Sequence, residues 1–84
     1  TNELSVFPNP ASDHLILEFK TPMSEPFQVM LTDAVGKLVL VKNYNFTDGQ
    51  SQLLIDVSYL PAGFYSLKAK SESMLNIIKV VVQK

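Results

Sequence analysis

Apolar side chains at every second position are the feature that most constrains the fold of this chain. The spacing is clearest in three segments, at Leu15, Leu17 and Phe19, at Phe27, Val29 and Leu31, and at Tyr65, Leu67 and Ala69. A period of two places such residues on one face of a β-strand, whereas a helix needs a period near 3.6. We therefore predict strands at these places, each with one face buried.

Two further segments contain consecutive apolar residues. One is Leu38-Val39-Leu40-Val41, and the other comprises residues 77–78 and 80–82 near the end of the chain. Runs of this kind, rich in β-branched residues, are typical of strands covered on both faces. We predict strands here too, with both faces buried.

Proline, glycine and short polar clusters separate these segments at regular intervals. Pro22 and Pro26 bracket a predicted loop, and Leu60–Gly63 predicts a type I turn. The predicted strands cover residues 4–7, 14–20, 27–32, 37–42, 52–57, 64–70 and 75–83. Turns at intervals of about 8–12 residues are typical of a β-sandwich. We predict an all-β, seven-stranded antiparallel sandwich with essentially no helix.

Size and composition indicate one folded unit. The chain has 84 residues, of which 46% are hydrophobic and 18% are charged. This composition is too apolar for a disordered linker, and no apolar run approaches the roughly 20 residues of a membrane helix. We expect a single soluble domain over residues 1–84, with residues 1–3 as the end of an upstream linker. Thr1 is not an initiator methionine and no signal peptide follows it, so we expect a piece of a larger protein.

Few residues suit catalysis or metal binding. There is no cysteine, His14 is the only histidine, and Asp33, Asp48 and Asp56 lack the spacing of a calcium loop. The net charge is −1 and the seven positive charges are lysines spread along the chain, which argues against nucleic acid as a partner. We predict no catalytic residue, no metal site, no cofactor and no enzymatic activity.

Three aromatic residues, Tyr44, Phe46 and Tyr59, lie in or beside predicted loops. Aromatic rings in such places can stack on a sugar ring, or they can cover the open ends of a sandwich core. The first interpretation predicts an accessory carbohydrate-binding or adhesion module of a secreted hydrolase. We keep it as the alternative function.

Three ordered motifs followed by a basic end carry a family resemblance. The motif positions are Pro8, Asn9 and Pro10, then Asp33, Gly36 and Lys37, then Leu60, Pro61, Gly63 and Tyr65. Residues 79–84, Lys-Val-Val-Val-Gln-Lys, complete the set. In this order the motifs resemble the C-terminal sorting domain, type A, of the type IX (Por) secretion system. The resemblance covers nearly the whole chain.

This resemblance implies an immunoglobulin-like sandwich that acts as a secretion signal. It implies a Gram-negative bacterium of the Bacteroidota and a cargo protein that folds in the periplasm before crossing the outer membrane. The implied partners are the type IX translocon and a sortase-like cysteine protease that removes the domain. The cargo is then secreted or held at the cell surface, where it can be joined to lipopolysaccharide.

Each motif also has a physical role that follows from its residues. Pro8 and Pro10 lack backbone donors, so we expect the first strand to leave its ladder there and cross toward the other sheet. Asp33 can accept backbone N–H groups across a tight turn in which Gly36 takes an unusual dihedral. We expect the turn at Pro61 to introduce a strand with the Tyr65 ring directed inward.

The last strand is the part we predict to be recognised. Its open edge can accept a strand from a partner, and its alternating side chains can provide selectivity. The predicted translocon-recognition residues are Lys79, Val80, Val81, Val82, Gln83 and Lys84. The same open edge predicts possible self-association between copies of the chain.

Overall fold

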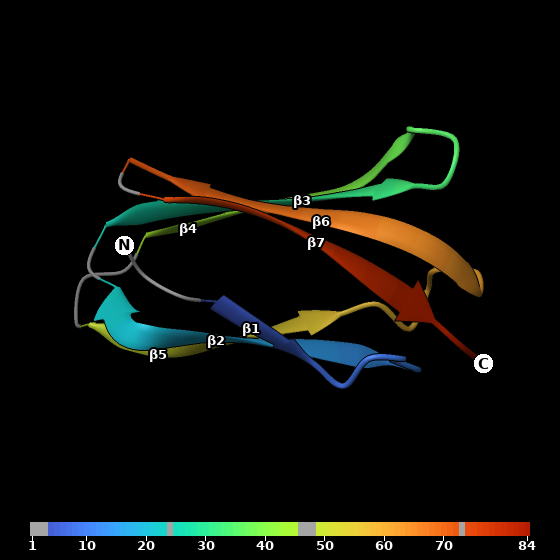
Figure 1. Cartoon of the computed structure of the whole chain (residues 1–84), viewed down its shortest axis with the longest axis horizontal. Coiled ribbons are helices and arrows are strands. Elements are labelled where there is room, and N and C mark those ends of the chain that lie inside the picture. The colour runs from blue at the N-terminus through green and yellow to red at the C-terminus, as the bar shows by residue number, and fades with distance from the viewer. Residues whose placement is uncertain (1–3, 24, 46–48, 73) are drawn as a thin grey trace.

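Two antiparallel sheets form the domain. The structure is a computed structural model and describes residues 4–23, 25–45, 49–72 and 74–84. Its strands are β1 (Leu4–Phe7), β2 (His14–Met23), β3 (Pro26–Asp33), β4 (Leu38–Asn45), β5 (Gln50–Asp56), β6 (Gly63–Ser71) and β7 (Leu75–Val82). One sheet has the order β1-β2-β5 and the other has the order β4-β3-β6-β7 (Figure 1). The all-β prediction is confirmed, and no helix occurs within the described ranges.

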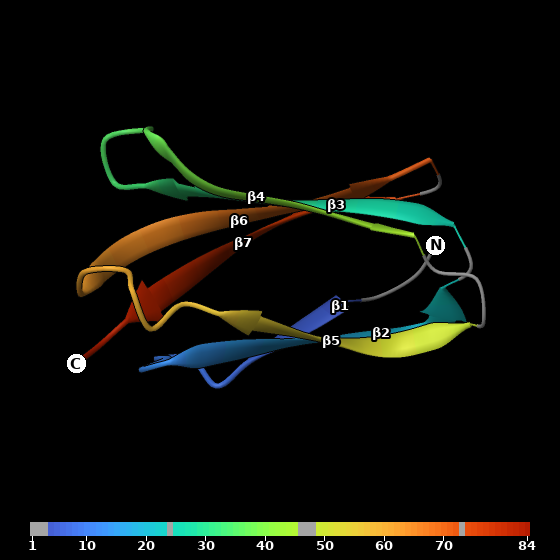
Figure 2. The same ribbon diagram turned by 180° about the vertical axis from the view of Figure 1, so that it is seen from behind.

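The core lies between the two sheets, which form separate layers in both views (Figures 1 and 2). All nine side chains at the alternating positions predicted to face inward are buried. Phe19 of β2 meets Phe27 of β3 across the layers, with ring centroids 4.9 Å apart and an edge-to-face angle of 87°. Among the described residues the buried set contains no charged or polar side chain. Burial of apolar surface between the layers therefore stabilises the fold.

Pro22 lies within a strand, so the loop predicted between Pro22 and Pro26 is present but shorter than expected, and the strand predicted to end at residue 20 is longer. β2 continues to Met23, and β3 begins at Pro26 itself. The pairing of β2 with β5 shifts register between Glu18 and Met23. A proline is tolerated at such an irregularity because the local ladder does not need its missing N–H.

The prediction that the apolar runs are covered on both faces is also wrong. β4 and β7 are the two edge strands of the four-stranded sheet. Leu40 and Val80 are buried, whereas Leu38, Val41 and Ile77 are exposed. The other sheet covers only one face of this sheet, and no further described layer lies on its outer face. The additional apolar side chains therefore lie on the surface.

The first strand crosses between the sheets as predicted from Pro8 and Pro10. β1 pairs with β2 in the three-stranded sheet, with Phe7 opposite Ile16. Four residues after Phe7, Ala11 forms a parallel bridge with Val82 in the other sheet. Its side chain is buried, so this short segment connects both layers.

No helix among the described residues is long and apolar enough to cross a membrane.

Candidate functional site

The three motifs and the last residues lie together at one end of the domain. We call this the motif end, and it comprises residues 8–11, 33–37, 57–65 and 79–84. Asp33 pairs with Tyr65, Gly63 pairs with Val82, and Val82 forms a bridge with Ala11. In Figure 1 the turn between β3 and β4, the loop before β6 and the C-terminus all lie on the right-hand side. These motifs lie up to 76 positions apart in the sequence, and tertiary pairing brings them together.

Asn9 and Ala11 cover the outer edge of β7. The Val81 N–H donates to Asn9 Oδ1 at 3.0 Å, and Asn9 Nδ2 donates to the Lys79 carbonyl at 3.2 Å. The Ala11 N–H then donates to the Val81 carbonyl at 2.8 Å, and the Gln83 N–H donates to the Ala11 carbonyl at 2.7 Å. The Asn9 carboxamide thus takes the place of a peptide group of a neighbouring strand. We call this set of four hydrogen bonds the edge clasp.

Replacing Asn9 with alanine should weaken the attachment of β7. Two hydrogen bonds of the edge clasp are lost, each worth about 0.5–1.5 kcal/mol, so we expect the unfolding free energy to fall by about 1–3 kcal/mol. Urea denaturation measures this change, and hydrogen exchange at the Val81 amide should become faster. Asn45→Ala is the control, because Asn45 is an exposed asparagine at the other end of the domain. Equal stability and equal Val81 exchange in both variants would show that the clasp contributes nothing.

The turn after β3 has the geometry predicted for Asp33. Its carboxylate accepts the N–H of Val35 at 3.1 Å and the N–H of Lys37 at 2.9 Å. The backbone of Asp33 also donates to the Lys37 carbonyl and accepts from Gly36, whose φ is +87°. This positive φ favours glycine, because a side chain at that position would be strained. The prediction for Asp33 and Gly36 is confirmed.

The loop before β6 differs from the predicted turn. The hydrogen-bonded turn spans Val57–Leu60, where the Leu60 N–H donates to the Val57 carbonyl at 3.0 Å, so the type I turn predicted at Leu60–Gly63 is wrong. Pro61 instead supplies a carbonyl that accepts the hydroxyl of Tyr65 at 2.6 Å. The Tyr65 ring is buried, as predicted. This hydrogen bond fixes the loop to the strand that follows it, in the manner of a tyrosine corner.

Removal of the Tyr65 hydroxyl alone should show how much its hydrogen bond to the Pro61 carbonyl contributes to the unfolding free energy. We expect Tyr65→Phe to lower the unfolding free energy by about 1–2 kcal/mol, because the ring stays packed while one hydrogen bond is lost. Thermal denaturation of the purified chain is the measurement. Tyr59→Phe serves as the matched control, because Tyr59 is exposed. A change in Tyr65→Phe no larger than that in Tyr59→Phe would contradict the assignment.

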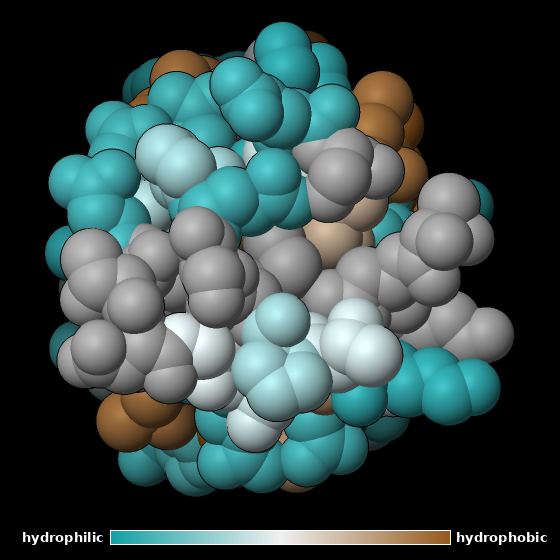
Figure 3. Space-filling view, turned by 90° about the vertical axis from the view of Figure 1, so that its left-hand side faces the viewer, coloured by the Kyte–Doolittle hydropathy of each residue, from teal (hydrophilic) through white to brown (hydrophobic). Residues whose placement is uncertain are grey.

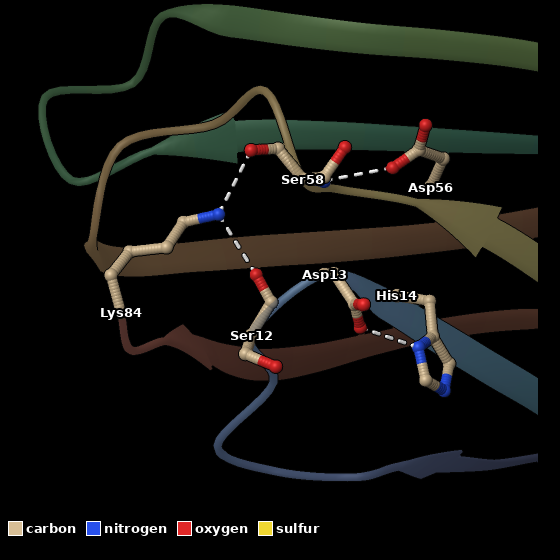
Figure 4. A network of polar contacts seen from close by, with 6 residues as sticks. All are labelled: Ser12, Asp13, His14, Asp56, Ser58 and Lys84. Carbon is tan, nitrogen blue, oxygen red and sulfur yellow. Dashed lines mark hydrogen bonds and ion pairs between the residues drawn. The ribbon is translucent and has the colours of Figure 1, made fainter.

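Lys84 connects the last residues to two loops. Its Nζ donates to the carbonyl of Ser12 at 2.8 Å and to the carbonyl of Ser58 at 2.9 Å (Figure 4).

Hydrogen bonds from the side chain and the backbone of Ser58 lower the pKa of the Asp56 carboxyl. Because the pKa of Asp56 is lower in the folded than in the unfolded chain, its hydrogen bonds to Ser58 stabilise the fold at any pH above the unfolded pKa. This stabilisation is lost as the pH falls through the folded pKa.

The family comparison agrees with this arrangement of motifs. The family model for the secretion system C-terminal sorting domain matches residues 5–83. The chain belongs to this family. It is a sorting domain of type IX secretion, and the resemblance derived from the sequence is confirmed. Membership implies a secreted or cell-surface protein of a Gram-negative bacterium, and the family is not an enzymatic one. No curated protein matches the chain.

The six residues predicted for recognition divide into two groups in the sorting domain. Val80 and Val82 are 0% and 1% exposed and belong to the core. Lys79, Gln83 and Lys84 are exposed, and Val81 is half-buried. The edge clasp already occupies both outer backbone groups of Val81, the carbonyl of Lys79 and the N–H of Gln83. A partner strand can pair with this part of β7 only after Asn9 and Ala11 have moved away.

Exposed apolar side chains also occur at the motif end, and they are not among the site residues predicted from the sequence. Val35 is 88% exposed and Phe64 is 71% exposed. They line a shallow depression between the Asp33 turn and the Pro61 loop. Phe64 occupies an outward position of β6 next to the buried Tyr65, so the alternation of this strand indicates that Phe64 is exposed. Val35 lies in a turn, where no periodic pattern exists to indicate its exposure.

The three aromatic residues of the alternative hypothesis do not form one platform. Tyr44 lies opposite Phe27 near the start of β3, whereas Tyr59 lies in the turn at the motif end. Phe46 lies outside the described residues. Tyr44 packs against the core, and this partial burial raises the pKa of its hydroxyl.

The domain end shown in Figure 3 is largely hydrophilic over its described residues, with hydrophobic side chains at its margins.

The described residues offer little for catalysis or metal binding. No group of three or more histidine, cysteine or carboxylate side chains lies close enough to hold a metal ion within the described part of the chain. His14 Nδ1 lies 2.6 Å from Asp13 Oδ1, and both side chains are substantially exposed to solvent. Asp48 lies outside the described residues. Asp33 and Asp56 bind backbone N–H groups of their own turns.

Proposed function

We propose that this sorting domain directs a periplasmic cargo protein through the outer membrane by the type IX secretion system and is then cleaved off. The family match over residues 5–83 is the observation that carries this proposal. In this proposal the domain has an immunoglobulin-like topology, with two antiparallel sheets and the Tyr65–Pro61 corner as support. The source is a member of the Bacteroidota, as the sequence resemblance implies.

The translocon contacts the motif end in this proposal. The predicted set of residues 79–84 remains the centre of the contact, and Lys79, Gln83 and Lys84 are its exposed members. Phe64 and Val35 add apolar surface beside it. Val80 and Val82 support the contact indirectly, because their burial holds β7 against the opposite sheet. A receptor for many cargoes benefits from a surface that belongs to the sorting domain alone.

A reporter fusion tests whether the chain is a secretion signal. Residues 1–84 are placed after a periplasmic reporter in a type IX-competent strain, and delivery of the reporter to the cell surface is measured. We expect delivery by the unchanged domain and loss of delivery when Val80–Lys84 are removed. Equal surface delivery with the complete and the trimmed domain would contradict the proposal, as would failure of the complete domain to deliver.

Truncation alone does not separate recognition from folding, since it also removes two core valines. The double variant Lys79→Ala/Gln83→Ala keeps the core and removes only exposed side chains. We expect it to lower delivery while its melting temperature stays unchanged, because it affects the contact and not the fold. Lys20→Ala, an exposed lysine of β2, is the matched control.

Processing completes the proposed sequence of events. A sortase-like cysteine protease removes the domain, and we place the cut in the segment before Leu4, where the upstream linker joins β1. Mass spectrometry of the exported reporter tests this position. A reporter that keeps residues 4–84 after export would contradict cleavage.

A further inference from the structure

The charged side chains of the domain are segregated between its two sheets. The four strands β3, β4, β6 and β7 contain four lysines, at Lys42, Lys68, Lys70 and Lys79. They contain one carboxylate, Asp33, and this group binds the N–H groups of its own turn. The strands of the other sheet contain two carboxylates, Glu18 and Asp56, and one lysine, Lys20. The four-stranded sheet is therefore the basic layer, although the lysines are spread along the sequence.

Five residues of β6 and β7 form a continuous patch on the outer face of this layer. We call it the β6–β7 patch, and it comprises Lys68, Lys70, Leu75, Ile77 and Lys79. Lys68 lies opposite Ile77, and Lys70 lies opposite Leu75. On β6, Leu67 and Ala69 are buried, and on β7 the intervening Asn76 and Ile78 are half-buried, so alternation directs all five patch residues away from the core. Two aliphatic side chains thus lie beside three cations.

Lys68, Lys70 and Lys79 form no ion pair with any residue in the described ranges. A described carboxylate near them, Glu72, follows the end of β6 and lines a depression with Lys70. Leu75 and Ile77 are 57% and 67% exposed. Exposed apolar side chains surrounded by charges of one sign are typical of a surface that binds a partner of the opposite sign.

The backbone of β7 is open beside this patch. Residues 79, 81 and 83 direct peptide groups to the outer edge, where the edge clasp binds four of them. With a period of two, Leu75 and Ile77 direct their N–H and C=O groups to the same edge. No hydrogen bond to these groups occurs on that side among the described residues, because β7 pairs there with the Asn9–Ala11 segment only. The edge clasp therefore ends at Lys79, which is also the last residue of the β6–β7 patch.

We propose that the β6–β7 patch is a docking surface for an acidic protein segment, which extends the sheet at Leu75–Ile77 and places its carboxylates against Lys68, Lys70 and Lys79. This inference rests on the proposed function, since the partner is a component of the export machinery. Four residues of the patch, Lys68, Lys70, Leu75 and Ile77, lie outside the set 79–84, and Lys79 is shared by the two contacts. The patch thus supplies a second contact, which remains available while the edge clasp is closed.

The patch fits a protein better than other anionic partners. Anionic membranes are typically bound by clusters of about four to eight basic residues, and this patch has three. A lipid surface or a nucleic acid does not form a β-ladder with the open peptide groups of β7, whereas an added strand pairs with them. A second copy of the chain offers the same basic patch across a two-fold axis, and like charges would then face each other.

Charge reversal in the reporter fusion tests the docking surface. Lys68→Glu/Lys70→Glu and, separately, Ile77→Asp alter the patch without touching residues 79–84. The controls are Lys20→Glu and Leu54→Asp; Leu54 is 68% exposed on the other sheet and matches the 67% exposure of Ile77. We expect both patch variants to lower surface delivery at least about tenfold and both controls to stay within about twofold of the unchanged domain. Thermal denaturation of each purified variant verifies folding.

The outcomes separate this inference from the proposed function. If both patch variants deliver the reporter as well as the controls do, the docking surface is overturned. If the unchanged domain does not deliver the reporter, the proposed function is overturned and the docking surface with it. If Lys68→Glu/Lys70→Glu does not fold, Lys68→Gln/Lys70→Gln removes the charges without reversing them. A photo-cross-linking residue at position 77 then identifies the neighbour. A cross-link to an acidic protein segment, lost in the lysine variants, supports the proposal. Cross-links to lipopolysaccharide, to a second copy or to nothing overturn it.

Discussion

Removal of Val80–Lys84 is expected to unfold the sorting domain rather than to shorten a folded one. Val80 and Val82 are fully buried, and residues 80–82 pair with Tyr65, Phe64 and Gly63 of β6. Burial of each valine contributes about 1.5–3 kcal/mol, before the lost ladder and edge-clasp hydrogen bonds are counted. A domain of this size has a total stability of about 5–15 kcal/mol. The deletion therefore removes most of the available stability.

Circular dichroism and urea denaturation measure this effect. We expect the truncated chain to lack a cooperative unfolding transition at 25 °C. The control is Lys79→Ala/Gln83→Ala, which keeps every buried side chain and should change stability by no more than about 0.5 kcal/mol, as is usual for surface substitutions. A truncated chain that unfolds cooperatively at the melting temperature of the complete domain would show that residues 80–84 are dispensable for folding. Loss of secretion on truncation would then report recognition directly.

Phe19→Ala should have the largest effect of any single substitution in the core. Phe19 is buried in β2 and contacts Phe27 of the opposite layer edge to face. Truncation of a buried phenylalanine typically costs about 3–5 kcal/mol, and loss of the ring pair is part of that cost. Because 1 kcal/mol shifts the melting temperature of such a domain by about 4–8 °C, we expect a decrease of at least about 12 °C.

Calorimetry or thermal circular dichroism measures this decrease. The matched control is Phe64→Ala, where the same side chain is removed from an exposed position. We expect the control to lower the melting temperature by no more than a few degrees. Similar decreases in both variants would contradict the assignment of Phe19 to the contact between the layers.

Much of the fold was predictable because it depends on local patterns. Alternation predicted which faces of β2, β3 and β6 are buried, and Asp33 with Gly36 predicted the geometry of one turn. Pro8 and Pro10 predicted the crossing of the first strand between sheets. Each of these features follows from a few adjacent residues and their backbone preferences. The family resemblance was carried by the same local motifs.

The errors arose where local signals depend on tertiary context. Consecutive apolar residues in β4 and β7 indicated strands covered on both faces, but their sheet has its outer face exposed. Pro22 indicated that the strand ends before it, whereas β2 continues through Pro22 at a register shift. The recognition residues at 79–84 were selected as one set, whereas alternation within β7 divides them between core and surface.

The strands, their inward faces and the family are predictable from the amino-acid sequence, because they depend on residue type and on spacing within a strand. Which strands are edges, which residues cover them and where the charges lie depends on the packing of the whole chain. Asn9 closes one half of the β7 edge although 70 positions separate it from Lys79. Pairing between strands that are distant in sequence sets these relations, and no local pattern encodes the choice of partner.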